Sequence, residues 1–142
     1  MSTPNLSPVQ HPRVRIGGQS LELRFTLVAE YKLSEWGVNL ADFLKCLRPD
    51  SKDQRRYSLG IALFAACVAH HYVTAGEPVP TGEQWMVNIE AATPDIQDRK
   101  KALGDIITAV YQEVTRHLDE VKKLLPSQQP VQEVTAQPDP AA

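Results

Sequence analysis

The chain of 142 residues is about one domain long, and its hydrophobic fraction of 42% and charged fraction of 23% are ordinary for a globular protein. Its formal net charge of −2 argues against the strongly basic surface that nucleic-acid-binding domains show. Residues 1–12 are too polar for a signal peptide, and the apolar run 61–69 is too short to cross a membrane. We therefore expect a cytoplasmic protein without nucleic-acid or membrane partners.

Composition and alternation divide the chain into tails and one domain. Residues 1–12 and 126–142 are rich in Pro and Gln and predict disordered tails, which leaves 13–125 as a single helical domain. On both sides of Gly17 and Gly18 polar and apolar residues alternate, which predicts a β-hairpin with a tight turn. Its core-facing residues would be Val14, Ile16, Leu21, Leu23 and Phe25.

Capping residues and periodicity predict about five helices after the hairpin, over residues 26–36, 40–47, 51–74, 81–92 and 94–125. The expected starts are the N-caps Thr26 and Asn39, the capping boxes Ser51–Gln54 and Thr81–Gln84, and Thr93 followed by Pro94. Gly37 and Gly76 would end the first and third helices. The expected fold class is mainly α with an N-terminal β-hairpin.

Two helices carry most of the apolar pattern. Residues 61–69 are apolar on every side, which predicts a buried central helix. The last helix carries one continuous stripe, whose part from Leu103 to Tyr111 we expect to pack on that central helix. Two readings stay open for the distal half: it packs back as well, or it offers its apolar face to a partner helix. The partner-binding residues would be Val114, Leu118, Val121 and Leu125, and self-association is a further reading.

No arrangement of residues predicts an enzyme. Nucleophile elbows, phosphate-binding loops and zinc-binding helix motifs do not occur in the sequence. His70 and His71 point about 100° apart on a helix and so do not suit one metal ion, and His117 is expected to be packed. Glu113 with His117 is interpreted as a surface pair. We expect no catalytic residue, cofactor or metal. Cys46 and Cys67 lie in apolar segments, and whether they approach each other stays open.

The hairpin and first helix are similar to a known family. The segments Arg-Ile-Gly-Gly-Gln and Leu-Glu-Leu-Arg-Phe-Thr, followed by Ala-Glu-Tyr-Lys-Leu-Ser-Glu-Trp-Gly at 29–37, resemble the opening of tail assembly chaperones of tailed phages and gene transfer agents. The segment Pro-Thr-Gly-Glu-Gln-Trp at 80–85 resembles a later step of that family. The resemblance covers about residues 13–92.

This resemblance implies a helical protein that binds the long tape measure protein during tail morphogenesis and leaves before maturation, acting in the host cytoplasm. The family defines no catalytic residues, so none is transferred to this chain. Two other functions stay open: a structural tail or adaptor component of the virion, and a small regulatory protein that binds a host target.

Overall fold

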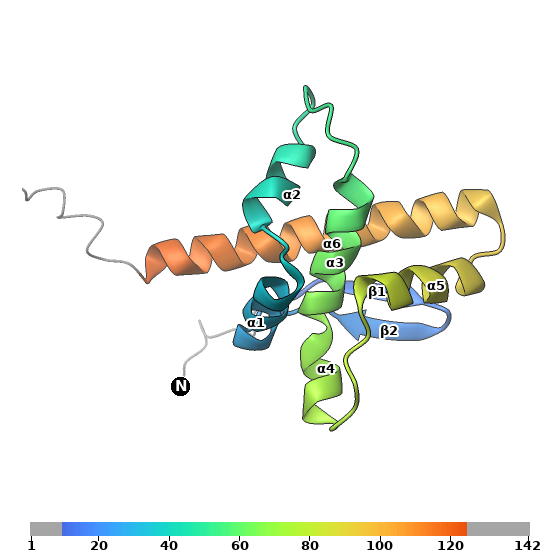
Figure 1. The fold of residues 1–142 in the computed structure, drawn as a ribbon, viewed down its shortest axis with the longest axis horizontal. Helices are drawn as coiled ribbons and strands as arrows, with labels where there is room; N and C mark the ends of the chain where they lie inside the picture. Colours follow the sequence, from blue (N-terminus) through green and yellow to red (C-terminus); the bar gives the residue numbers. More distant parts are fainter. Residues whose placement is uncertain (1–9, 125–142) are drawn as a thin grey trace, which may run out of the picture.

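A computed structural model describes residues 10–124 and has the predicted mainly helical architecture with an N-terminal hairpin (Figure 1). The elements in chain order are β1 (Arg13–Ile16), β2 (Gln19–Glu22), α1 (Leu27–Trp36), α2 (Leu40–Cys46), α3 (Arg56–Cys67), α4 (Ala69–Thr74), α5 (Gly82–Ala92) and α6 (Ile96–Lys123). In Figure 1, α3 stands across the middle of the molecule and the long helix α6 crosses it. Helices α1 and α2 lie on one side of this crossing, and α5 and the hairpin lie on the other.

The hairpin forms as predicted and closes one side of the core. Strands β1 and β2 pair antiparallel with Val14 opposite Leu21, so these two side chains share the buried face. Gly17 and Gly18 have φ of 56° and 85°, the positive values that a two-residue turn of this kind requires. All five residues predicted to face the core are buried, at 9% exposure or less. The predicted hairpin and its orientation are therefore confirmed.

Helix α3 is the buried centre of the fold, as its apolar sequence predicted. Eight of its twelve residues are buried, and it packs against α1, α2, α5 and α6. The ring of Phe64 meets Trp85 of α5 edge to face, with the ring centroids 5.1 Å apart. Among the described residues, one stretch, Arg56–Thr74, is long and apolar enough to cross a membrane by composition, with a mean hydropathy of 1.2. Half of it is buried in the domain, so its apolar character has a packing explanation.

Three of the predicted helix starts are confirmed. Thr26 accepts a hydrogen bond from the Ala29 N–H, and Asn39 accepts one from the Ala41 N–H. Thr81 and Gln84 form the reciprocal capping box that starts α5. Gly37 ends α1 with a φ of 68°, as expected for a left-handed C-terminal residue.

Two predicted starts and one predicted length are wrong. Ser51 does not cap a helix, because its hydroxyl accepts the Asp53 N–H in the loop before α3. The Asp53 carboxylate accepts the Arg55 N–H, and α3 begins only at Arg56. The last helix is capped by Asp95, whose carboxylate accepts the Gln97 and Asp98 N–H groups, whereas the Thr93 hydroxyl donates to the Ile89 carbonyl.

The third predicted helix is interrupted at Val68. The carbonyl of Cys67 accepts the Arg24 N–H at the end of the hairpin, at 2.9 Å. That carbonyl is therefore not used for a regular helical bond, and α4 starts as a separate short helix.

Helices α3 and α6 approach each other closely at a glycine. A Cβ atom on Gly60 would lie 2.1 Å from the Ile107 Cδ1 atom and 3.4 Å from the Phe43 ring. On α6, by contrast, a Cβ atom on Gly104 would meet nothing within 4 Å. The two helical glycines therefore differ in what surrounds them.

We expect Gly60→Leu to lower the free energy of unfolding by about 1–3 kcal/mol, because the added side chain overpacks the α3–α6 contact. Gly104→Ala should instead raise it by about 0.5–1 kcal/mol, because alanine favours a helix interior and fits without contact. Urea unfolding monitored by circular dichroism measures both changes. A neutral Gly60→Leu would contradict the close approach of the two helices.

Candidate protein-binding site

An apolar groove lies between α1 and the distal half of α6. We call it the α1–α6 groove; its volume is about 480 Å³ and its lining residues are Phe25, Glu30, Leu33, Ser34, Val38, Asn39, Leu40, His117, Leu118 and Val121. The buried ring of Phe25 stacks on the His117 ring with the centroids 4.4 Å apart. At the rim, His117 Nε2 lies 4.0 Å from a Glu30 carboxylate oxygen. The groove thus combines apolar walls with one acidic residue at its edge.

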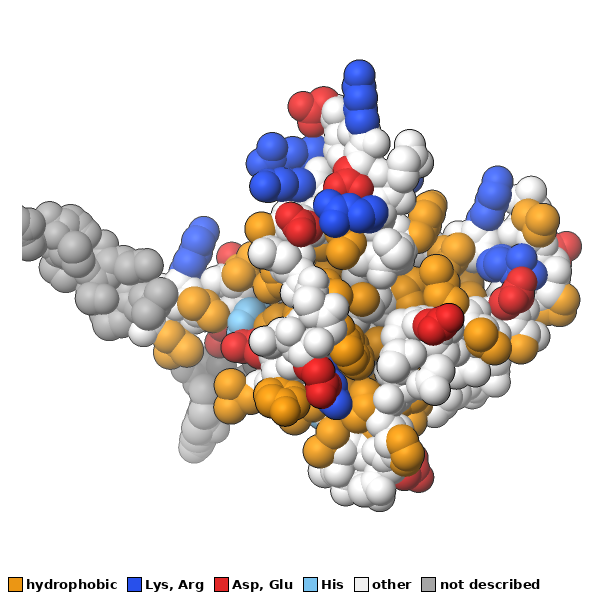
Figure 2. All heavy atoms as spheres, in the orientation of Figure 1, with side chains coloured by type: hydrophobic (Ala, Val, Ile, Leu, Met, Phe, Trp, Pro, Cys, Tyr) orange, Lys and Arg blue, Asp and Glu red, His pale blue; other side chains and the backbone are white. Residues whose placement is uncertain are grey.

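The distal part of α6 leaves the body of the domain, where Figure 1 shows it extending past α1. Val114 is the last buried residue of the helix, and none of residues 115–124 is buried. The stripe nevertheless continues: Leu118 is 37% exposed, Val121 36% and Leu124 73%. Figure 2 shows hydrophobic side chains gathered over this part of the molecule. An apolar face that the described residues of the domain cover only in part is typical of a surface that binds another protein.

The four predicted partner-binding residues have different positions. Leu118 and Val121 line the α1–α6 groove and are accessible. Val114 is fully buried in the hydrophobic core, so the prediction is corrected for this residue: it is closed to a partner. Leu125 lies outside the described residues. The accessible part of the predicted surface is therefore the turn that carries Leu118 and Val121.

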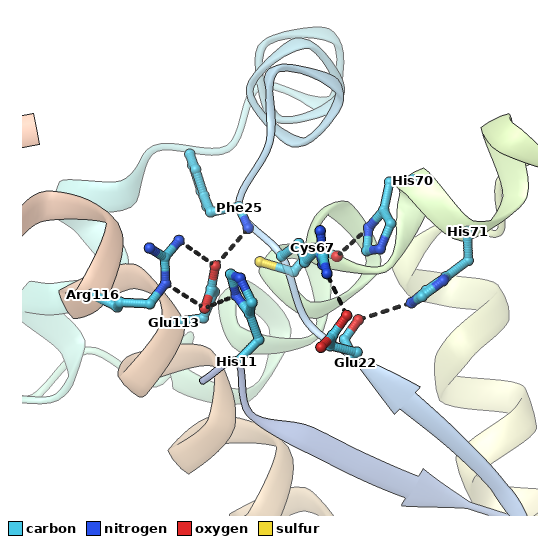
Figure 3. Close-up of polar contacts among 9 residues, drawn as sticks. His11, Glu22, Phe25, Cys67, His70, His71, Glu113 and Arg116 are labelled. Carbon is cyan, nitrogen blue, oxygen red and sulfur yellow. Dashed lines mark hydrogen bonds and ion pairs between the residues drawn. The ribbon is translucent and has the colours of Figure 1, made fainter. Parts of the chain in front are cut away.

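Glu113 is the residue that sequence reasoning placed wrongly. Interpreted as a surface partner of His117, it is fully buried at 0% exposure. One carboxylate oxygen accepts the Phe25 N–H at 2.8 Å, and Arg116 bonds both oxygens at 3.0 and 2.8 Å (Figure 3). His11 Nδ1 lies 3.0 Å from the other oxygen, although it belongs to the segment predicted to be a disordered tail. One side chain of α6 thereby holds two distant parts of the chain.

These contacts decide the charge of the Glu113 carboxyl group. Burial raises its pKa, but hydrogen bonds from Arg116, the Phe25 N–H and His11 outweigh burial, so the pKa lies below its ordinary value of 4.5. The same bond raises the pKa of Arg116. The pair is therefore ionised, and it fixes the backbone at Phe25, whose ring is part of the groove.

A periodic signal for the burial of Glu113 exists in the sequence. Glu113 follows Val110 by three residues and Ile106 by seven, which places all three on one face of the helix. Because Ile106 and Val110 are fully buried, position 113 must be buried as well. The residue was nevertheless predicted to lie on the surface, because a carboxylate is rarely buried without partners. Two of its partners, Phe25 and His11, are far away in the sequence.

The remaining histidines and cysteines have structural contacts. His71 Nε2 lies 2.9 Å from the Glu22 carbonyl, and His70 Nδ1 lies 3.2 Å from the Cys67 carbonyl. Cys46 and Cys67 are buried free thiols, and burial raises the pKa of each. Within residues 10–124 no group of three His, Cys, Asp or Glu side chains is arranged to hold a metal ion. Of these residues, His71 joins α4 to the hairpin through the Glu22 carbonyl.

A second apolar groove, of about 430 Å³, lies between α1, α3 and α5. Its lining includes Trp36, Ile61, Ala62, Gly82 and Met86. Val38 lines both grooves, so the connection between α1 and α2 separates them.

Replacing Glu113 by Ala should lower the free energy of unfolding by about 3 kcal/mol, because Arg116 and the Phe25 N–H would lose their buried partner. Asp119→Ala, on the exposed side of the same helix, should change it by less than about 0.5 kcal/mol. Chemical denaturation at pH 7 measures both values. Equal effects of the two substitutions would contradict the anchoring role.

The pH dependence of stability provides a separate test. Because the folded protein lowers the pKa of Glu113, its stabilising effect is complete above about pH 4.5 and is lost as the pH falls through the lowered value. The gap in unfolding free energy between wild type and Glu113→Gln should therefore narrow from pH 7 to pH 3. A gap that stays constant over this range would show that the charge of Glu113 does not contribute.

The comparisons with known proteins add no relative: no family model, no curated protein and no solved structure matches the chain. The function therefore has to be argued from the α1–α6 groove and from the resemblance in the hairpin and first helix.

Proposed function

We propose that this protein is a tail assembly chaperone of a tailed phage or gene transfer agent, which binds a helical segment of a tape measure protein and catalyses no reaction. The observation that carries this proposal is the distal part of α6, whose apolar stripe is partly exposed along the α1–α6 groove. Its accessible residues Leu118 and Val121 are three positions apart and share one helical face.

The dimensions and chemistry of the groove suit an amphipathic helix. In this mode of recognition a partner helix lays apolar residues at positions i, i+3 or i+4, and i+7 into an apolar groove. Leu33, Leu40 and Phe25 line the groove together with Leu118 and Val121. The carboxylate of Glu30 is 54% exposed at the rim, where a basic residue of the partner would pair with it.

The resemblance points to the same part of the molecule. The segments similar to tail assembly chaperones form the hairpin, the connection that holds Phe25, and α1, and the last two contribute lining residues to the groove. A tape measure protein is a very long helical chain, and its exposed apolar stripes would aggregate before the tail tube encloses them. Covering such stripes requires an apolar groove and no chemistry.

We expect the double variant Leu118→Glu with Val121→Glu to lose binding to the tape measure protein, by at least tenfold in Kd, while its melting temperature stays within a few degrees of wild type. Both residues are partly exposed, so the charges are tolerated in the folded state but not under an apolar partner. Co-purification and solubility of the co-expressed tape measure protein measure the effect.

Two control variants accompany this test. Leu27→Glu, at an 81% exposed leucine of α1 outside the groove, should leave binding unchanged. Val114→Glu, at a fully buried position, should lower the unfolding free energy by more than about 3 kcal/mol. Unchanged binding by the folded double variant would overturn the proposal that the groove is the binding site.

Whether the protein is present in mature particles distinguishes a chaperone from a structural tail component. A chaperone should be absent from the mass spectrum of purified particles and should be encoded directly before a very long reading frame. Stoichiometric amounts in mature particles would favour the structural alternative. Failure to bind or solubilise the neighbouring long protein would leave a regulatory role toward a host target.

A further inference from the structure

Charged residues are divided unevenly along this nearly neutral chain. Residues 45–56, which lead from the end of α2 into α3, include five basic and two acidic residues, a net charge of +3. The next 42 residues, 57–98, include five acidic residues and no Lys or Arg. A formal net charge of −2 for the whole chain therefore conceals two regions of opposite sign.

The basic region forms a projecting tip. We call it the basic apex; its residues Lys45, Arg48, Lys52, Arg55 and Arg56 are all exposed. Figure 2 shows Lys and Arg side chains gathered at the top of the molecule, where Figure 1 places the connection between α2 and α3. Within residues 10–124, Arg55 is the one apex residue with an acidic partner, Asp53, at 2.8 Å. Beside the apex, the exposed ring of Tyr57 carries the Arg56 guanidinium 5.2 Å from its centre.

The acidic region presents an exposed helix face. Glu83, Val87 and Glu90 are spaced four and three residues apart, so they share one face of α5, and Val87 is 62% exposed. Met86, 41% exposed, adds apolar area beside them, and Glu77 is exposed in the connection before α5. We call these five residues the acidic face. In the described part of the chain its nearest basic partner is Arg99, 4.0 Å from Glu90 at the far end of the helix.

The two surfaces do not meet within one molecule. In Figure 1 the apex lies at the upper end of α3, whereas α5 packs beside its lower half. No ion pair joins the apex to the acidic face among the contacts of residues 10–124. A second copy of the same chain is therefore the simplest molecule that carries both the charge and the apolar residues that each surface requires.

We propose that copies of this protein associate head to tail, with the basic apex of one copy against the acidic face of the next. Opposite potentials orient such an encounter, and Tyr57 with Val87 and Met86 adds apolar contact. Because the two surfaces differ, the contact is heterologous, and repeated contacts build a ring or an open filament rather than a closed dimer. The proposal goes beyond the proposed function, since its surfaces lie outside the α1–α6 groove.

Charge reversal on each surface tests this arrangement in the full chain. The apex variant carries Arg48→Glu, Lys52→Glu and Arg56→Glu; the face variant carries Glu77→Lys, Glu83→Lys and Glu90→Lys. A control variant, Lys100→Glu with Lys122→Glu and Lys123→Glu, reverses three exposed charges of α6. Sedimentation velocity at about 50 mM and 500 mM salt measures association, because the screening length is about 10 Å at 0.1 M salt and shortens as salt rises, which weakens attraction between exposed charges. Circular dichroism verifies that each variant is folded.

We expect the wild type and the control to form concentration-dependent oligomers at low salt that dissociate at high salt. The apex and face variants should each associate at least tenfold more weakly alone. Their equimolar mixture should associate again, because each reversed surface then meets an opposite charge on the other variant. The control carries the same formal net charge as the apex variant, so its unchanged association distinguishes paired surfaces from a general effect of net charge.

Several results would overturn the proposal. The wild type could stay monomeric at low salt, or it could form a closed dimer whose association does not depend on salt. The apex and face variants could also fail to associate when they are mixed. Binding of the apex to a short RNA or DNA duplex without self-association would assign the apex to nucleic acid instead. Each of these outcomes leaves the test of the α1–α6 groove intact, because that test uses Leu118 and Val121 and a different partner.

Discussion

The ionised carboxylate of Glu113 is the contact on which the candidate site depends. A buried charge is tolerated only when hydrogen bonds and an opposite charge replace the water that it loses. Arg116 supplies the charge, and the Phe25 N–H and His11 supply contacts from the N-terminal part of the chain. Without this carboxylate the Phe25 N–H, next to the start of α1, would lose its partner on α6.

Features set by neighbouring residues were predicted well from the sequence. The hairpin follows from alternation around two glycines, and the caps at Thr26, Asn39 and Thr81 follow from short polar side chains before apolar runs. The burial of α3 follows from its composition, because a helix that is apolar on every side has no face for water. Each of these features depends on interactions within a few residues.

Features set by distant residues were missed, and the candidate site is built largely from them. The break at Val68 arises because the hairpin uses the Cys67 carbonyl, and the burial of Glu113 arises from residues 88 and 102 positions away. The apolar stripe of a helix also does not show at which residue the rest of the domain stops burying it. The sequence therefore predicted Leu118 and Val121 together with Val114, although the boundary between core and surface lies between Val114 and Leu118.

The separation between Phe25 and Glu113 has a consequence for the time at which the groove forms during synthesis. At about 5–20 residues per second, a ribosome needs roughly 4–18 s to add the 88 residues between them. During that interval the hairpin and α1 have been synthesised, but the Phe25 N–H has no carboxylate of α6 to bond. The α1–α6 groove therefore comes into existence late, as α6 emerges, and a partner can dock there only on a chain whose final helix has already folded.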